Sequence, residues 1–295
     1  LGAAVAVTSV AARQVFRAGT DTVWLAVTVT DAQGRPIAGL DRDDFQIFED
    51  GTRQDISIFE RDPQPIALSL LIDSSTSMED KIGMAKEAAA GFTSTLGPRD
   101  AAQIIDFNSD TRIRQAFTHD SVALDKAIRA IRTGGSTSLY TALYIAISEL
   151  TRERDKTPDE RRRQAIIVLS DGEDTTSLKS YEDVAEVVKS SGVAIYAIGL
   201  REKPTGTVRR FNQGDFALRS FSQMTGGRLF SVEDPRQLPA IYMQIATELA
   251  SQYFIGYNTR NLQRNGAWRQ INVRVTRPET VVRTRSGYYG PTQSQ

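Results

Sequence analysis

The sequence contains no cysteine, which excludes disulfides and thiolate chemistry. Its single histidine, His119, is expected in a surface loop, and no G-x-S-x-G motif is present, so a serine hydrolase is not indicated. Lysine plus arginine equals aspartate plus glutamate at 36 each, so no net charge draws the chain to nucleic acid or membrane. Beyond residues 1–12, no stretch is long and apolar enough to span a bilayer.

Residues 1–12 differ from the rest of the chain because they are small and apolar and precede Arg13. They fit the end of a signal peptide, but an edge strand or an arm explains them equally well. On the first interpretation, we expect an extracytoplasmic protein, either secreted or periplasmic.

The first block, residues 13–62, has a β pattern. "TVWLAVTVT" (residues 22–30) alternates apolar and polar side chains, as a strand with one buried face does. "DDFQIFEDG" and "QDISIF" predict two further short strands with a turn at Asp50-Gly51. "PQPI" (residues 63–66) breaks the pattern and is expected to be a linker.

The second block, residues 66–250, alternates apolar strands with amphipathic helices, which predicts a mostly parallel sheet with helices on both faces. "NSDT" (residues 108–111) separates two strand-like runs and predicts a hairpin, and therefore one antiparallel edge strand. The central strands are continuous apolar runs, typical of strands buried on both faces. They are expected at Ile66–Ile72, Ala102–Phe107, Ala165–Leu169 and Val193–Ile198.

The third block, residues 252–290, returns to a β pattern and is rich in arginine, whereas residues 31–62 are mainly acidic. An isolated hairpin is rarely stable, so we expect the first and third blocks to form one β-sandwich-like domain into which the α/β domain is inserted. Two unrelated β extensions are the alternative. The arginines, which are expected on a solvated face or paired with the acidic block rather than on nucleic acid, are Arg269, Arg274, Arg277, Arg283 and Arg285.

Oxygen-bearing side chains gather where the predicted strands end. Asp73 and Asp171 each follow the carboxyl end of a buried strand, the edge at which open α/β sheets bind ligands. A third loop, "GGSTSLYTAL", opens a helix with hydroxyls at Ser136, Thr137 and Ser138. Hydroxyls at a helix start are usually caps, but three oxygen-rich loops at one edge predict a binding site.

Oxygen ligands indicate a hard cation, namely Mg²⁺, Mn²⁺ or Ca²⁺. If Ser75, Ser77 and Thr137 bind the ion directly, its first coordination shell is neutral. Asp73 and Asp171 would then act mainly through water, by orienting the coordinated groups. An ion held this way keeps an open position that an anionic oxygen from outside would fill, which describes a binding site rather than a catalytic one.

Asp73-x-Ser75-x-Ser77, a threonine in the third loop (Thr137) and Asp171-Gly172 resemble the metal-ion-dependent adhesion site of von Willebrand factor A domains. The resemblance covers roughly residues 66–250, and the flanks are similar to those of bacterial, exported members. It implies a Rossmann-like fold, a divalent cation that is usually Mg²⁺, and a protein ligand whose Asp or Glu carboxylate completes the coordination.

Two positions depart from the family pattern. Thr76 stands where many members carry glycine, which is expected to stiffen the loop. Ser136 lies between Gly135 and Thr137, where many members place the threonine directly after the glycines. The Thr-x-Leu pattern favours Thr137 as the ligand, and Ser136 is the alternative.

Two alternative functions and two predictions for charged loops accompany this hypothesis. A phosphoryl-transfer enzyme could use Asp73, Asp171, Glu173 and Asp174 to gather Mg²⁺, but no phosphate loop ending in lysine is present, so we expect no enzyme. A metal that only stabilises the scaffold is the other alternative.

"RERDKTPDERRR" (residues 152–163) is expected to be a solvent-exposed loop. The loop after Gly199 is expected to favour an acidic partner through its basic residues, Arg201, Lys203, Arg209 and Arg210.

Overall fold

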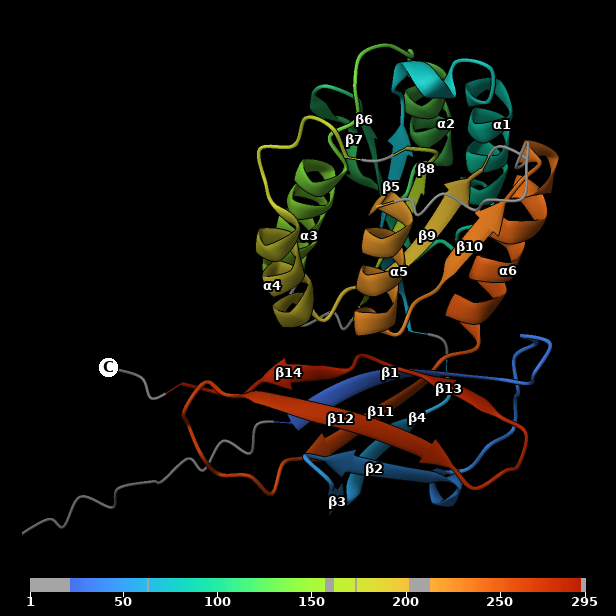
Figure 1. The fold of residues 1–295 in the computed structure, drawn as a ribbon. Helices are drawn as coiled ribbons and strands as arrows, with labels where there is room; N and C mark the ends of the chain where they lie inside the picture. The colour runs from blue at the N-terminus through green and yellow to red at the C-terminus, as the bar shows by residue number, and fades with distance from the viewer. Residues whose placement is uncertain (1–21, 63, 157–161, 173, 202–212, 293–295) are drawn as a thin grey trace, which may run out of the picture.

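The fold is taken from a computed structural model that describes residues 22–62, 64–156, 162–172, 174–201 and 213–292. A six-stranded sheet with helices on both faces occupies one half of the molecule, and two four-stranded antiparallel sheets occupy the other (Figure 1). The predicted fold class is therefore confirmed. Residues 1–12, for which a signal peptide or an arm was considered, lie outside the described residues.

The six-stranded sheet has the order β10-β9-β8-β5-β6-β7. All neighbours are parallel except β6 and β7, which form the hairpin predicted at residues 108–111. Its strands are β5 (Ile66–Asp73), β6 (Ala101–Phe107), β7 (Thr111–Thr118), β8 (Arg163–Ser170), β9 (Ala194–Leu200) and β10 (Leu229–Val232). The four central strands lie within two residues of the bounds predicted from the sequence.

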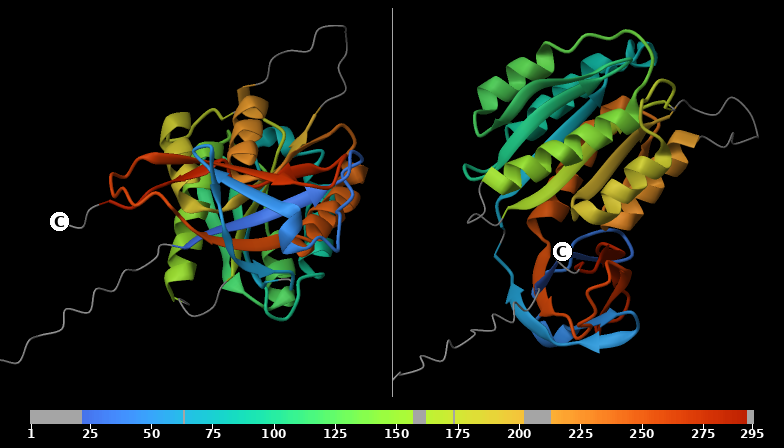
Figure 2. Two further views of the ribbon diagram at one scale, coloured as in Figure 1. Left: turned by 90° about the horizontal axis from the view of Figure 1, so that it is seen from below. Right: turned by 90° about the vertical axis from the view of Figure 1, so that its left-hand side faces the viewer.

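Two hydrophobic cores cover the faces of this sheet, because every residue of β5 is buried and successive side chains point to opposite faces. Leu68 and Leu70 pack into the core shared with α1, α2 and α6, whereas Ala67 and Leu71 pack into the core shared with α3, α4 and α5. The right-hand view of Figure 2 shows the two helical layers. The helices are α1 (Ile82–Thr93), α2 (Ser121–Arg129), α3 (Leu139–Lys156), α4 (Tyr181–Ser191), α5 (Gln213–Thr225) and α6 (Leu238–Ala250). Short 3-10 turns occur at Arg42–Asp44, Thr76–Met78 and Pro235–Gln237.

The two antiparallel sheets, called here the β sandwich, have the orders β13-β1-β11-β4 and β14-β12-β2-β3 and share one hydrophobic core. Each sheet combines strands from both ends of the chain. The N-terminal strands are β1 (Thr22–Thr30), β2 (Phe45–Glu49), β3 (Thr52–Gln54) and β4 (Ile56–Glu60). The C-terminal strands are β11 (Tyr253–Asn258), β12 (Trp268–Val275), β13 (Val281–Arg283) and β14 (Gly287–Tyr289).

β4 and β11 pair antiparallel from Glu60 opposite Phe254, so the strands that flank the α/β half are hydrogen-bonded neighbours. The turn at Asp50 and Gly51, both with positive φ, joins β2 to β3 as expected. The run "QDISIF" is not one strand, because Gln54 ends β3 in one sheet and Ile56 begins β4 in the other.

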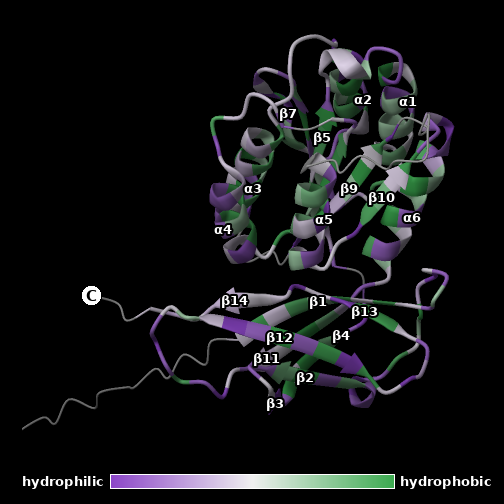
Figure 3. Cartoon of the chain, viewed as in Figure 1, coloured by the Kyte–Doolittle hydropathy of each residue, from purple (hydrophilic) through white to green (hydrophobic). Residues whose placement is uncertain are grey.

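A buried polar cluster lies inside the β sandwich. The carboxylate of Glu49 accepts hydrogen bonds from the hydroxyls of Tyr257 (2.7 Å), Tyr288 (2.9 Å) and Thr259 (2.6 Å). Arg269 lies 3.6 Å from the same carboxylate and is 1% exposed. Of the two expectations for Arg269, the solvated face is wrong and pairing with the acidic N-terminal block is confirmed, because Glu49 belongs to that block. Figure 3 shows the hydrophilic residues along β12, which contrast with the hydrophobic β5.

The β sandwich contacts the α/β half at the edge opposite to Asp73, beside the ends of α4, α5 and α6 (Figure 1). Arg283 of β13 pairs with Glu248 of α6 at 2.5 Å, and Glu248 is fully buried. The Ser286 N–H donates to the Met224 carbonyl at 2.9 Å. These contacts leave the carboxyl ends of the parallel strands free of the β sandwich.

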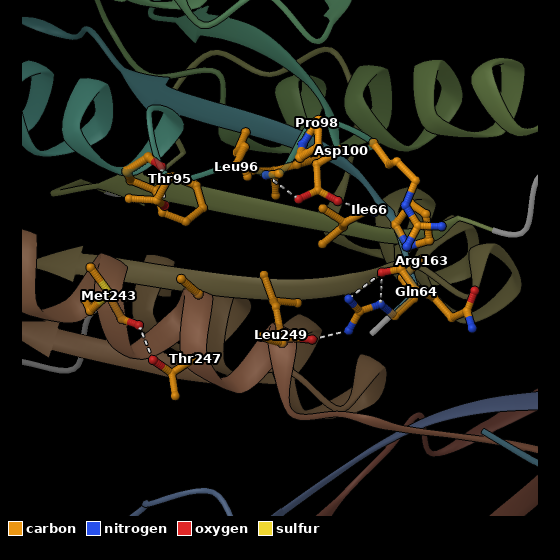
Figure 4. A pocket seen from close by; sticks show the side chains of 17 residues that line it. Gln64, Ile66, Thr95, Leu96, Pro98, Asp100, Arg163, Met243, Thr247 and Leu249 are labelled. Carbon is orange, nitrogen blue, oxygen red and sulfur yellow. Dashed lines mark hydrogen bonds between the residues drawn. The ribbon is translucent and has the colours of Figure 1, made fainter. Parts of the chain in front are cut away.

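The segment at residues 152–163 differs from the exposed loop that its charges predicted. Residues Arg152 to Lys156 form the last turn of α3, and residues 157–161 lie outside the described residues. Arg163 begins β8, and its guanidinium donates to the carbonyls of Gln64 and Leu249 (Figure 4). Burial lowers the pKa of Arg163. Arg163 therefore connects the two points at which the chain crosses between the halves.

Candidate metal centre

Asp73 ends β5 in the middle of the six-stranded sheet and is fully buried. Its Oδ1 accepts the N–H of Ser75 at 2.8 Å, and its Oδ2 accepts the hydroxyl of Ser170 at 2.6 Å. Burial raises the pKa of Asp73, and the hydrogen bonds from Ser170 and Ser75 oppose that increase. The carboxylate is thus held in one orientation beneath the loop that follows β5.

Asp171 follows β8, the neighbour of β5, and connects two loops. Its Oδ1 accepts the hydroxyl of Ser77 at 2.7 Å, and the Oγ atoms of Ser77 and Ser75 lie 3.1 Å apart. Its Oδ2 pairs with the ammonium of Lys81 at 2.5 Å. The structure therefore joins Asp73, Ser75, Ser77 and Asp171 in one continuous polar cluster.

Thr137 completes this cluster from the third loop, just before α3. Its N–H donates to the Thr175 hydroxyl at 3.0 Å, and its carbonyl accepts the N–H groups of Thr175 (2.9 Å) and Thr176 (3.1 Å). A Cβ atom at Gly172 would lie 3.6 Å from Thr137 Oγ1 and 4.0 Å from Ser77 Oγ. Both hydroxyls therefore border Gly172, on the side to which a side chain at this position would project.

Ser136, the alternative to Thr137, has a different environment. It is exposed, and its N–H donates to the hydroxyl of Ser109 at 2.9 Å. Thr137 is 5% exposed and approaches Gly172. The geometry favours Thr137, and the assignment of the ion's ligands stays a prediction.

The first and third loops are tied together by Thr76, which stands where many members of the family have glycine. Both its N–H (3.0 Å) and its hydroxyl (3.1 Å) donate to the carbonyl of Gly135. Gly135 itself has a φ of 79°, and a Cβ there would lie 2.5 Å from Ser109 Oγ, so only glycine fits. Thr76 therefore adds a contact between loops that glycine could not make with a side chain.

The donor set fits a hard divalent cation. Three hydroxyl oxygens and two carboxylates are oxygen ligands of the kind that Mg²⁺ and Ca²⁺ prefer, and the space beside Gly172 gives them a common neighbour. Within the described ranges, no group of three or more His, Cys, Asp or Glu residues could hold a metal. Any ion at this edge would therefore depend on the serine and threonine hydroxyls.

Other predicted residues lie apart from the cluster or outside the described ranges. Asp174 accepts the Tyr140 N–H at 3.1 Å and so caps the start of α3, and Glu173 is not described. The ring Nδ1 of His119 lies 2.7 Å from the carbonyl oxygen of Asp100, which precedes β6 at the opposite edge of the sheet.

The basic loop after Gly199 is described only at its start. Arg201 is not a solvated rim charge, because it pairs with Asp215 of α5 and donates to the Asp171 carbonyl at 3.3 Å. Lys203, Arg209 and Arg210 lie outside the described residues.

Two functional candidates, Lys81 and Ser170, were missed at the sequence level. Ser170 is the last residue of an apolar strand, and Lys81 directly precedes the amphipathic helix α1. The position of Ser170 directly before Asp171 is a weak signal, and Lys81, which lies outside the Asp73-x-Ser75-x-Ser77 motif, has none. Only the packing of β5 against β8 shows that each contacts a carboxylate of the other strand's loop.

A cavity of 480 Å³ lies at the opposite edge, between α1, α6 and the start of β5 (Figure 4). Its walls are largely apolar, and Asp100 accepts the N–H groups of Ile66 (3.0 Å) and Gly97 (2.8 Å). Arg163 is engaged with backbone carbonyls. The cavity therefore lacks the gathered hydroxyls that mark the Asp73 edge.

Comparison with protein families identifies this architecture. The family description "von Willebrand factor type A domain" matches residues 68–244, which is more than half of the chain. The chain therefore belongs to the von Willebrand factor type A domain family, whose domains generally serve as interaction modules and commonly bind a divalent metal. A comparison with curated protein sequences found no match.

Solved structures with TM-scores above 0.5 share this fold at low sequence identity. A von Willebrand factor type A protein from Catenulispora acidiphila is 13% identical with a TM-score of 0.52, covering 92% of this chain and 75% of that one. Proximal thread matrix protein 1 from the mussel byssus, whose MIDAS motif holds zinc, is 18% identical with a TM-score of 0.51, covering 66% and 50%. BatB from Bacteroides thetaiotaomicron is 18% identical with a TM-score of 0.47, covering 62% and 98%.

Proposed function

We propose that this protein binds a partner protein through a divalent cation, most simply Mg²⁺, which coordinates an Asp or Glu carboxylate of the partner. The observation that supports this is the polar cluster at one sheet edge. In it, the hydroxyls of Ser75, Ser77 and Thr137 lie beside the buried carboxylates of Asp73 and Asp171.

The hydrogen bonds of the cluster assign different roles to hydroxyls and carboxylates. Ser77 donates to Asp171, and Ser75 is held over Asp73 by its N–H, so both serine oxygens keep lone pairs for an ion. Bound there, the cation would supply a Lewis-acidic position that accepts an anionic oxygen. Because Ser77 is exposed, a partner can approach it from solvent.

Binding rather than catalysis is the function that these residues support. Asp174, one of the carboxylates that a phosphoryl-transfer enzyme would use, is engaged in capping α3. His119 is at the other edge of the sheet. The described carboxylates of the proposed ion site, Asp73 and Asp171, already accept hydrogen bonds from Ser75, Ser170, Ser77 and Lys81.

Isothermal titration with Mg²⁺ and Mn²⁺ tests the metal site. The wild-type protein should bind one ion, and Asp73→Ala should abolish binding without unfolding the domain, as circular dichroism would confirm. Ser94→Ala, which removes an exposed hydroxyl at the end of α1 that donates to the Gly91 carbonyl, is the control. Unchanged metal affinity in Asp73→Ala would rule out this assignment.

A metal-dependent interaction screen against surface and exported proteins of the native host tests the partner. Captured proteins should be released by EDTA and lost with Thr137→Ala. A partner that binds equally well in EDTA would contradict the proposal. If the metal raised the melting temperature under the same conditions, its role would be to stabilise the scaffold.

The strand pairing supports a further part of the proposal, namely that residues 13–62 and 252–290 form one β domain that carries the domain at 66–250. The β sandwich lies at the edge opposite Asp73, so it would act as a stalk that presents the metal edge (Figure 1). We also propose an extracytoplasmic location, on the similarity of the flanks to exported bacterial proteins. No helix within the described ranges has both the length and the apolar character to cross a membrane. Cell fractionation tests the location.

A further inference from the structure

Lys81 places a positive charge inside the cluster proposed to bind a cation. It occupies the residue before α1, and its Nζ lies 2.5 Å from Asp171 Oδ2. The side chains of Lys81 and Asp171 are 19% and 2% exposed, so the pair is shielded from water. Forming a shielded pair costs desolvation energy, and removing one partner leaves an uncompensated buried charge, which is strongly destabilising. An ordinary surface salt bridge, by contrast, contributes little to stability.

The two oxygens of Asp171 have different partners. Oδ1 accepts the hydroxyl of Ser77, a proposed ion ligand, whereas Oδ2 is taken by the ammonium. Lys81 therefore keeps Asp171 in the orientation that positions Ser77. It does so without occupying Oδ1 or either serine oxygen.

A count of charges shows what Lys81 changes. Asp73 and Asp171 carry two negative charges, which a divalent cation would neutralise completely. With Lys81 included, the same loaded cluster keeps one positive charge. The ammonium therefore repels the entering ion, and the charge that remains attracts an incoming carboxylate.

We propose that Lys81 is a positioning residue that acts as a resident counter-cation: it holds Asp171 in place when no metal is bound, and it weakens metal binding so that the loaded site keeps a positive charge for an anionic ligand. This inference rests on the proposed function. Repulsion between the charge of Lys81 and a divalent ion bound beside Asp171 should change the affinity for that ion on the order of tenfold.

The experiment is a titration of Mg²⁺ and Mn²⁺ into wild-type protein and three variants. Lys81→Gln retains a hydrogen-bond donor but removes the charge, and it should bind Mg²⁺ about tenfold more tightly. Lys81→Arg keeps the charge and should stay within about twofold of wild type. Lys189→Gln is the matched control, because it removes the same charge from an exposed pair with Glu186 on α4.

Thermal melting separates this role from a purely structural one. In EDTA, Lys81→Gln should melt below wild type, because Asp73 and Asp171 then face each other without a counter-charge. Saturating Mg²⁺ should close that gap. If Lys81 only supports the start of α1, the gap stays equal in EDTA and Mg²⁺. If Lys81→Gln is unfolded without metal, folding on addition of Mg²⁺ supports the proposal, and failure to fold overturns it.

The two proposals fail differently. Wild-type binding of Mg²⁺ with equal or weaker binding by Lys81→Gln overturns the role of Lys81 and leaves the metal site intact. Absence of metal binding by wild type and all variants overturns the proposed function together with this inference.

Discussion

Replacing Arg283 with methionine should destabilise the junction between the α/β half and the β sandwich. Arg283 donates to Glu248 Oε2 at 2.5 Å and to the Gly227 carbonyl at 3.1 Å, and Glu248 is fully buried. Breaking a buried ion pair costs about 3–5 kcal/mol. Arg228 remains 3.6 Å from Glu248, so we expect about 2–4 kcal/mol.

The assay is thermal unfolding followed by circular dichroism. For a chain of this size, 1 kcal/mol corresponds to roughly 1.5–2 °C, so the midpoint should fall by about 3–8 °C. Arg274→Met, which removes an exposed arginine that lies over the Phe48 ring, should change the midpoint by less than about 1 °C.

A double-mutant cycle identifies the cause of the Arg283 effect. With Glu248→Gln the buried charge is gone, so adding Arg283→Met should cost about 1 kcal/mol or less. An equal fall in both backgrounds would show that Arg283 acts through packing, and the reasoning about an unpaired carboxylate would be refuted.

Three further predictions concern the metal edge and the core. Thr137→Ala should weaken Mg²⁺ binding about tenfold or more in titration calorimetry, whereas Ser136→Ala should not; the reverse would make Ser136 the ligand. Gly172→Leu should reduce Mg²⁺ affinity by filling the space beside Thr137, and unchanged affinity would place the ion elsewhere. Burial raises the pKa of Tyr196 to about 12 from 10.0. The contribution of Tyr196 to stability should therefore be fully present below about pH 10 and be lost toward pH 12, because its hydroxyl ionises there only in the unfolded state; Tyr196→Phe should reduce the decline in stability over that range in pH-dependent melting.

The central sheet could be predicted from the sequence because burial on both faces leaves a direct signature. Ile66–Asp73 is apolar at nearly every position, and a run of that length has few alternatives to a strand. The short strands of the β sandwich were harder. Whether Ile56 continues the strand of Gln54 or enters the other sheet depends on where β11 lies, which local sequence does not encode.

The sequence predicts the hydroxyl residues of the candidate site, but it does not predict which side chains from other segments contact the two aspartates. The spacing Asp73-x-Ser75-x-Ser77 places three oxygen-bearing side chains in one turn, so the motif can be recognised from this segment alone. The bond from Ser170 to Asp73 and the pair of Lys81 with Asp171 join separate segments. They follow from the parallel register of β5 and β8, which no single segment specifies.

Arg269 is a charged residue on the buried face of its strand. It alternates in step with Ile271 and Val273 of β12, so the period of the strand places it on the inward face, and it is among the largest fully buried side chains. The Thr259 hydroxyl and the Asn261 carbonyl accept hydrogen bonds from its guanidinium, and the Glu49 carboxylate lies 3.6 Å away, so burial is compatible with its charge. Pairing with the acidic N-terminal block was one of the two expectations for this arginine, but periodicity does not identify Glu49, which is distant in sequence, as the partner.

The pairing of β4 with β11 has a consequence for the order of folding. Glu60 and Phe254 stand opposite each other as the residues of a hairpin do, yet the entire α/β half separates them along the chain. In the unfolded state, joining these two residues would require closing a very long loop. The loss of chain entropy on closure precedes the contacts that would offset it. Once the α/β half has folded, Arg163 holds Gln64 and Leu249 at the same place, and the loop is already closed. The β sandwich should therefore form late, and pulsed hydrogen exchange should protect β5 and β8 before β4 and β11.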